Sequence, residues 1–307
     1  MNVLVTGGAG FIGSHIVDRC VQEGHQVSVI DDLSTGKKKN VNRNAAFYKM
    51  DIGSSRVDRA FKNERPVVLV HMAAQMNVRR STEDPRFDAQ VNIMGTINLL
   101  EHAVKYGVRK VVFASSGGTV YGEQQVFPAS ESHPLQPLSP YGISKLSCEY
   151  YLKYFECVYG IKHVALRFAN VYGPRQNPEG EAGVVAIFTQ KMLQGEQPLI
   201  NGNGMQTRDY VYIGDVLEAV MRSMNSEVTG IYNVGTGQET TVNAIFTELK
   251  AFTNSTCKEI HGPAKKGELE RSVLDAGKLS KDTGWEATVS LTDGLSETVQ
   301  FFREQEQ

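Results

Sequence analysis

The stretch that decides the fold is Val3-Leu4-Val5-Thr6-Gly7-Gly8-Ala9-Gly10-Phe11-Ile12-Gly13. A short apolar strand leads into a G-x-x-G-x-x-G pattern, and a helical pattern follows until Gly24. Glycine permits the tight turn and lets the backbone approach a pyrophosphate, whose charge the free N–H groups of the helix start can bind. The stretch therefore predicts a dinucleotide site that includes Gly7, Gly10, Phe11, Ile12 and Gly13.

The end of the next apolar run indicates which dinucleotide is bound. A strand over Gln26–Ile30 ends in Asp31 and Asp32. A carboxylate at this place is expected to accept a hydrogen bond from the adenosine ribose, and it would repel a 2′-phosphate. We therefore expect NAD rather than NADP, with an ordinary turn residue as the alternative role of Asp31.

Further apolar runs predict the rest of the sheet. Val67–Val70, Lys110–Ala114 and His163–Arg167 are typical of strands buried on both faces. Helical patterns over residues 84–106 and 141–158 alternate with them. The alternation predicts an α/β fold, a Rossmann-like doubly wound parallel sheet.

The composition of the chain changes after about Phe168, where glycine and proline become more frequent and the predicted strands become shorter. We expect an NAD-binding Rossmann domain over residues 1–170, with some later segments returning to it. Residues 171–307 are expected to form mainly a smaller C-terminal α/β substrate-binding lobe.

Composition excludes several classes of protein. Of 307 residues, 41% are hydrophobic and 21% charged, which is typical of a globular chain. Lys and Arg number 32 against 34 Asp and Glu, so no basic excess points to nucleic acid or to a membrane surface. The four cysteines and the histidines show no metal-ligand spacing, so no metal is expected. Reduced cysteines and a start without a signal-peptide pattern suit the cytoplasm.

A pair of residues four apart carries the predicted chemistry. Tyr141 and Lys145 form a Y-x-x-x-K motif, which places both on one face of a helix. An ammonium beside a phenol favours the phenolate and is expected to lower the pKa of Tyr141, so that it can exchange a proton with an alcohol. Ser116, at the end of the strand that begins at Lys110, is expected to hold the same oxygen, with Ser115 and Thr119 as lesser candidates.

These motifs together resemble the extended short-chain dehydrogenase/reductases, and within them the UDP-glucose 4-epimerases. The resemblance also rests on Leu166-Arg167-Phe168-Ala169-Asn170-Val171-Tyr172-Gly173-Pro174-Arg175 and on Arg208-Asp209-Tyr210-Val211, and it extends to about Asp275. It implies an NAD cofactor, a UDP-sugar substrate and a homodimer built through a four-helix bundle. Cys148, Tyr151 and Leu152 would lie either on that dimer face or in the core.

The resemblance implies further site residues. Those expected at the cofactor, besides the glycine loop, are Asp31, Asp32, Leu33, Ser34, Gly36, Asp51, Ile52, Met72, Ala73, Ala74, Gln75, Asn92, Ser115, Tyr141, Lys145 and Phe168. Those expected at the substrate are Ser116, Tyr141, Asn170, Val184, Leu199, Arg208 and Arg271. Either Arg271 or Lys265 would replace the diphosphate-binding arginine that the family usually carries.

The motifs favour one reaction over its relatives. Related dehydratases carry Asp-Glu directly after the active-site hydroxyl residue, and related decarboxylases place a glutamate nearby, whereas Gly117-Gly118 stands here. We therefore expect C4 epimerisation of UDP-glucose and UDP-galactose through a 4-keto sugar. The small Ser272 would leave room for the acetamido group of UDP-GlcNAc and UDP-GalNAc. UDP-glucuronate epimerisation, dehydration or decarboxylation are alternatives, and a non-catalytic NAD-binding regulator is a remote one.

Overall fold

The computed structural model describes residues 1–179, 183–264 and 269–306. The chain divides into two compact units. The first consists of Met1–Val120, Pro137–Arg167 and Leu217–Tyr232, and the second of Tyr121–Gln136, Phe168–Val216 and Asn233–Gln307. The first unit therefore includes a segment from late in the sequence.

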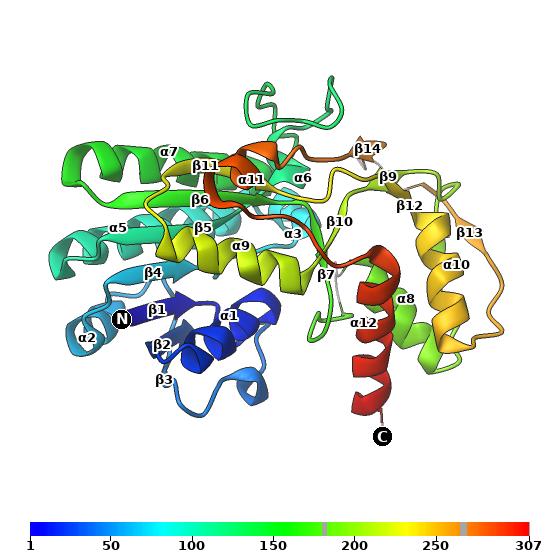
Figure 1. Cartoon of the computed structure of the whole chain (residues 1–307), viewed down its shortest axis with the longest axis horizontal. Helices are drawn as coiled ribbons and strands as arrows, with labels where there is room; N and C mark the ends of the chain where they lie inside the picture. The colour runs from blue at the N-terminus through cyan, green and yellow to red at the C-terminus, as the bar shows by residue number, and fades with distance from the viewer. Residues whose placement is uncertain (180–182, 265–268, 307) are drawn as a thin grey trace. The chain divides into compact units, whose positions relative to one another are not determined.

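A seven-stranded sheet is the centre of the first unit (Figure 1). Its strands lie in the order β11 (Gly230–Val234), β6 (Lys162–Phe168), β5 (Lys110–Ser116), β4 (Val68–His71), β1 (Asn2–Thr6), β2 (Gln26–Asp31) and β3 (Ala46–Lys49). The chain leaves β1 toward β2 and β3 and then returns to β4 on the other side of β1. The order thus reverses between β1 and β4, and in such sheets ligands bind at the carboxyl ends of the two strands beside the reversal.

The predicted Rossmann-like fold is confirmed. All five strands expected from apolar runs are present, but β3 and β11 were not foreseen. Each of these two is an edge strand and carries only a short apolar pattern. The helix α2 (Val57–Glu64) was also not foreseen, because its eight residues bury only one narrow apolar stripe.

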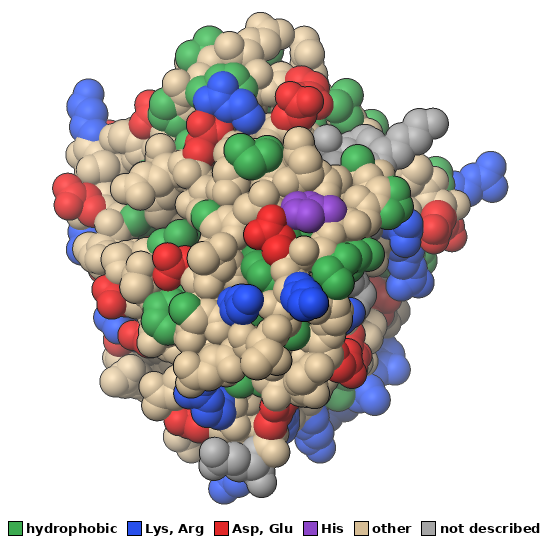
Figure 2. Space-filling model, turned by 90° about the vertical axis from the view of Figure 1, so that its right-hand side faces the viewer, with side chains coloured by type: hydrophobic (Ala, Val, Ile, Leu, Met, Phe, Trp, Pro, Cys, Tyr) green, Lys and Arg blue, Asp and Glu red, His purple; other side chains and the backbone are tan. Residues whose placement is uncertain are grey.

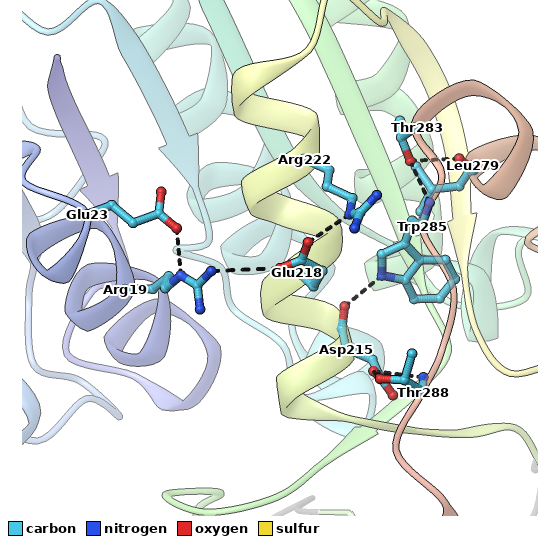
Figure 3. A network of polar contacts seen from close by, with 9 residues as sticks. All are labelled: Arg19, Glu23, Asp215, Glu218, Arg222, Leu279, Thr283, Trp285 and Thr288. Carbon is cyan, nitrogen blue, oxygen red and sulfur yellow. Dashed lines mark hydrogen bonds and ion pairs between the residues drawn. The ribbon is translucent and has the colours of Figure 1, made fainter.

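Helices cover both faces of this sheet. On one face α2, α5 (Gly95–Tyr106) and α7 (Pro140–Tyr159) pack on a core that includes Leu4, Leu69 and Phe113. On the other face Cys20 of α1 (Phe11–Gln22) meets Met221 of α9 (Ile213–Asn225). Arg19 also approaches Glu218, which bonds Arg222 (Figure 3).

The long helix expected over residues 84–106 is interrupted. It consists of α4 (Pro85–Ala89), a π-helical turn η2 (Gln90–Met94) and α5, and a separate helix α3 (Val78–Glu83) precedes it. A π turn inserts one extra residue into the helical ladder and is often found at functional sites. Here it contains the buried Asn92.

The second unit is built from short strands and longer helices. Its strands pair as β10–β7, as β12–β9–β14 and as β13–β8. They are β7 (Asn170–Tyr172), β8 (Ile200–Asn201), β9 (Thr207–Arg208), β10 (Tyr210–Tyr212), β12 (Thr240–Thr241), β13 (His261–Gly262) and β14 (Arg271–Ser272). The helices α8 (Val184–Leu193), α10 (Val242–Thr253) and α12 (Leu291–Gln305) pack together, and α11 (Gly277–Thr283) lies before α12.

A buried indole fixes the segment that leads into α12. The Trp285 Nε1 donates to the carbonyl of Asp215 at 2.9 Å, and the Asp215 carboxylate accepts bonds from Thr288 (Figure 3). Trp285, the lone tryptophan of the chain, is 2% exposed. These bonds anchor an otherwise irregular stretch of chain.

The surface carries charges of both signs. Figure 2 shows one face on which Lys and Arg side chains are scattered among Asp and Glu side chains. Among the described residues no helix is long and apolar enough to cross a membrane, and no group of metal-ligating side chains was found within that same part of the chain.

Candidate active site

The glycine loop joins β1 to α1 in a turn that admits no larger residue. Gly7 has a left-handed φ of 69° and its N–H donates to Ile30 O at 2.9 Å. A Cβ on Gly7 would lie 2.7 Å from Ala73 N, and a Cβ on Gly13 would lie 2.2 Å from Gly7 O. The backbones of the loop and of the Met72–Ala73 segment thus lie close together at the carboxyl ends of β1 and β4.

Asp31 ties the end of β2 to this loop. Its carboxylate accepts from Ala9 N at 2.9 Å and from Leu33 N at 2.8 Å. Burial raises the pKa of Asp31, and these two N–H donors oppose the rise. A Cβ on Gly36 would lie 2.9 Å from both Ala9 Cβ and Asp31 Oδ1, so the segment after β2 also packs on the loop.

These features fit an NAD molecule. A close-packed glycine turn, the start of α1 and an acidic residue at the end of β2 are the parts that bind a pyrophosphate and a ribose. Gly7, Gly10, Phe11, Ile12 and Gly13 would hold the pyrophosphate, and Asp31 the ribose. Asp32, Leu33 and Ser34 continue the same turn, in which Asp32 accepts from Ser34 N at 2.8 Å.

The segment expected beside the adenine follows β3. Ile52 is 5% exposed and packs against Gly95, where an added Cβ would lie 2.7 Å from Ile52 Cδ1. The Asp51 carboxylate is exposed and accepts from Gly53 N at 2.6 Å. Ile52 thus packs against the start of α5, and the adenine contact of both residues stays a prediction.

Asn92 holds the Met72–Gln75 segment, which is expected to line the cofactor and is called the cofactor segment below, through hydrogen bonds to Gln75. Its Oδ1 accepts from Gln75 N and its Nδ2 donates to Gln75 O, both at 2.9 Å. The second Nδ2 hydrogen goes to Asp88 at 3.0 Å. Since both amide hydrogens are used, Asn92 has no donor left for a cofactor and instead fixes the Met72–Gln75 segment.

Tyr141 and Lys145 lie in the first turns of α7. The Ser139 hydroxyl caps the helix by accepting from Gly142 N at 3.1 Å, and Pro140 occupies the first helical position. Lys145 Nζ donates to Ala114 O at 2.8 Å and lies 5.7 Å from the centre of the Tyr141 ring. The predicted pairing of phenol and ammonium on one helix face is present.

The expected lowering of the tyrosine pKa is wrong for the protein by itself. Burial raises the pKa of Tyr141, and the charge of Asp88 raises it further. Burial also lowers the pKa of Lys145 to about 8, against the opposing effects of Cys148, Asp88 and Glu149. The spacing of the motif says nothing about burial, which is the largest cause of the raised pKa of Tyr141.

The two serines that end β5 differ in their partners. The Ser115 hydroxyl donates to Glu149 Oε1 at 2.6 Å, and Glu149 forms a buried ion pair with Arg167 at 2.6 Å. The Ser115 hydroxyl therefore has no hydrogen left to donate to a cofactor, although its oxygen can still accept one. The Ser116 hydroxyl has no hydrogen-bond partner among residues 1–179, 183–264 and 269–306, so it is available to a substrate oxygen.

In the second unit the strand register separates the two candidate arginines. Ser272 pairs with Arg208 and Arg271 pairs with Thr207, so Arg208 and Ser272 share one face of the small sheet and Arg271 lies on the other. Arg271 forms a two-bond ion pair with Glu239, at 2.9 and 2.7 Å, and stacks on Phe127. This arrangement speaks against Arg271 as a substitute for the diphosphate-binding arginine, and Lys265 lies outside the described residues.

The remaining substrate candidates are distributed over the second unit. Asn170 begins β7 and pairs with Tyr210. Phe168, which was expected at the cofactor and not at the substrate, is 6% exposed at the end of β6. Val184 begins α8, and Leu199 is 48% exposed beside Gly262.

Sequence reasoning missed several buried polar residues behind the site. Asp88, Glu149 and Arg167 form hydrogen bonds with residues of the predicted site or their neighbours. His71 bonds Thr6 at 2.7 Å and Thr96 at 3.0 Å. The spacing of Asp88 and Asn92, four apart in a helical pattern, was the only available signal.

Known proteins similar to this chain agree with the geometry. A sequence model of the NAD dependent epimerase/dehydratase family matches residues 3–235. The chain is 42% identical over 313 residues to a UDP-glucose 4-epimerase of Mycolicibacterium smegmatis, with 100% of both chains covered.

Solved structures extend this similarity to the whole fold. A UDP-glucose 4-epimerase of Thermotoga maritima, solved with UDP-glucose, has a TM-score of 0.98, 48% identity and 100% coverage of both chains. That of Thermus thermophilus, in complex with NAD, has a TM-score of 0.95, 45% identity and 99% coverage of both chains. With its glycine loop, its Tyr141–Lys145 pair and these matches, the chain belongs to the NAD-dependent epimerase/dehydratase family.

Proposed function

We propose that this protein interconverts UDP-glucose and UDP-galactose by inverting C4 through a 4-keto sugar. The observation that carries the proposal is the pair of Tyr141 and the buried Lys145 on α7, in the same unit as the Ser116 hydroxyl and the glycine loop. The relatives of known structure that were solved with UDP-glucose and with NAD support it.

The residues of the chain handle the proton. Tyr141 Oη takes the proton of the C4 hydroxyl when the sugar is oxidised and gives it back to the C4 oxygen when the sugar is reduced. The Ser116 hydroxyl holds that oxygen, and the Lys145 ammonium stabilises the phenolate. When bound, NAD supplies an oxidising nicotinamide ring that takes and returns a hydride, and its positive charge favours a neighbouring phenolate.

The nucleotide is proposed to be held by the second unit. Asn170 and Arg208 would bind the uridine diphosphate, because a planar guanidinium can donate two parallel bonds to a phosphate. The hexose itself needs few fixed contacts, since it must present both faces of C4 in turn. Binding energy from the nucleotide, which does not react, permits this loose hold.

The choice among sugars rests on two positions. Ser272 is small and shares the face of Arg208, which supports acceptance of the 2-acetamido sugars. Gly117 and Gly118 offer no carboxyl group beside Ser116, which disfavours dehydration and decarboxylation. UDP-glucuronate is the remaining alternative substrate for the same chemistry.

A homodimer through α5 and α7 is part of the proposal. Ile143, Tyr150, Tyr154 and Val158 are 50–67% exposed on α7, and Met94 is 50% exposed just before α5. Such a stripe of large apolar side chains suits a helical interface. Cys148 and Leu152 are buried in the monomer core instead, while Tyr151 is 38% exposed. All four cysteines are free thiols, which suits a cytoplasmic location.

The test is incubation of purified protein with UDP-glucose, UDP-GlcNAc and UDP-glucuronate separately, followed by NMR of the products. We expect C4 epimers of the first two sugars and no release of CO₂ or of a deoxy sugar. Activity on UDP-glucose without activity on UDP-GlcNAc would reject the role of Ser272. Activity on UDP-glucuronate alone would reject the proposed substrate.

A further inference from the structure

Asp88 is a fully buried carboxylate beside the catalytic helix. Its Oδ1 accepts from Gln75 Nε2 at 2.9 Å and from Asn92 Nδ2 at 3.0 Å, and its Oδ2 accepts from Ser144 Oγ at 2.6 Å. The last distance is typical of a hydroxyl that donates to an ionised carboxylate. No lysine or arginine among the described residues forms an ion pair with it.

The bonds of Asp88 connect two parts of the site. Ser144 stands between Tyr141 and Lys145 on α7, while Gln75 and Asn92 hold the Met72–Gln75 segment after β4. A shift of α7 relative to this segment would break the Ser144 bond, which is buried from water. Asp88 therefore fixes the position of the catalytic pair relative to the segment expected to line the cofactor.

The charges around the pair are balanced only when Asp88 is counted. The Lys145 ammonium is 3% exposed and donates to a neutral carbonyl, whereas the nearby Glu149 is already paired with Arg167. The titratable groups that face Tyr141 and Lys145 are Asp88 from α4, Cys148 and Glu149 from α7 and the neutral His71 from β4. Asp88 is the one carboxylate of this set that has no cationic partner.

We propose that Asp88 is a positioning residue that holds α7 against the cofactor segment through Ser144 and serves as the buried counter-charge of Lys145. The proposal deepens the proposed function and rests on it. A negative charge raises the pKa of every group near it, so Asp88 keeps Lys145 protonated and delays ionisation of Tyr141. The rise of kcat at low pH and its fall at high pH should then both depend on Asp88.

The decisive variant is Asp88→Asn, which keeps an acceptor for Gln75 and Asn92 and removes the charge. We expect both limbs of the kcat profile to move to lower pH by at least ~0.5 unit. Ser144→Ala keeps the charge and removes the link, so kcat should fall roughly tenfold without a shift of the profile. Ser147→Ala is the matched control, because the Ser147 hydroxyl donates only within α7, to Ile143 O.

A second readout separates this inference from the proposed function. In NAD-loaded protein labelled with carbon-13 at tyrosine Cζ, the resonance lost in Tyr141→Phe should titrate at lower pH in Asp88→Asn than in the unchanged protein. If no UDP-hexose is epimerised, the proposed function fails, and this titration alone then tests the effect of Asp88 on the ionisation of Tyr141. An unshifted titration or kcat profile in Asp88→Asn would overturn the inference. Asp88→Ser replaces the variant if Asp88→Asn does not fold.

Discussion

The charged groups beside the catalytic pair in the first unit are buried, whereas charged groups of the small sheet in the second unit are in contact with solvent. In the first, Lys145 and Glu149 are each 3% exposed and bonded to named partners. In the second, the ion pair of Arg271 and Glu239 lies at the surface, and Arg271 stands on a strand of only two residues. Proton transfer needs pKa values set by a dry, fixed environment, while recognition of a charged nucleotide works in the presence of water.

The largest effect should appear in the first unit, when the phenol hydroxyl of Tyr141 is removed. Tyr141→Phe should lower kcat by roughly 10²- to 10⁴-fold, because the proton acceptor is lost. The protein should still be purified with NAD, measured by its absorbance after release. Tyr150→Phe, on the exposed side of α7, is the control and should keep its activity. Equal activity of both variants would remove Tyr141 from the mechanism.

The buried side of the comparison also predicts sensitivity to acid. Burial lowers the pKa of His71 to about 3. Thr96 already donates to Asn92 O, so His71 Nε2 must donate to Thr96 and Nδ1 must accept from Thr6. Neutral imidazole alone satisfies both bonds.

Between about pH 6.5 and 3 the unfolded chain therefore binds a proton at His71 that the folded protein does not, and the free energy of unfolding falls as the pH falls. Across this range the loss amounts to up to ~5 kcal/mol. His71→Gln should flatten the dependence, measured by urea unfolding at several pH values. The same slope in both proteins would show that His71 is not the group responsible.

Close packing at the glycine loop predicts a smaller but specific effect. Gly13→Ala places a methyl group 2.2 Å from Gly7 O, and such overpacking costs ~1–3 kcal/mol. We expect NAD affinity to fall roughly 10- to 100-fold in equilibrium dialysis. Gly118→Ala, where no atom lies within 4 Å of the new methyl group, should retain NAD. Parallel losses in both variants would contradict the packing argument.

The smallest effects are expected in the second unit, and they distinguish its two arginines. Arg208→Ala should raise the KM for UDP-glucose roughly tenfold through loss of charged hydrogen bonds to the diphosphate. Arg271→Ala should change that KM less than about twofold, because the contacts it removes are a surface ion pair with Glu239 and the stacking on Phe127. Steady-state kinetics of the two variants decide. A larger effect from Arg271 would restore it to the substrate site.

The same contrast explains what could be predicted from the sequence. The glycine loop, Asp31 and the Tyr141–Lys145 pair are local patterns, and each lies where its pattern placed it. Asp88 could not be found this way, because Ser144, which it meets only in the folded chain, lies 56 positions further along the sequence. Likewise the face on which Arg271 lies depends on the register of β14 with β9, which the two-residue strands do not reveal in sequence.

Burial accounts for the expectation that was wrong. The Y-x-x-x-K spacing correctly placed an ammonium beside Tyr141, but desolvation raises the pKa of the phenol, and the charge of Asp88 raises it further. The strands β3 and β11 were missed because edge strands of four and five residues carry little apolar pattern.

The most direct test of the central claim, that C4 is oxidised and reduced again within one closed site, uses UDP-glucose with deuterium at C4. The product should be UDP-galactose that retains the deuterium at C4, measured by NMR after partial conversion in ordinary water. UDP-galactose with protium at that carbon would mean that C4 exchanges with solvent, and it would contradict the account.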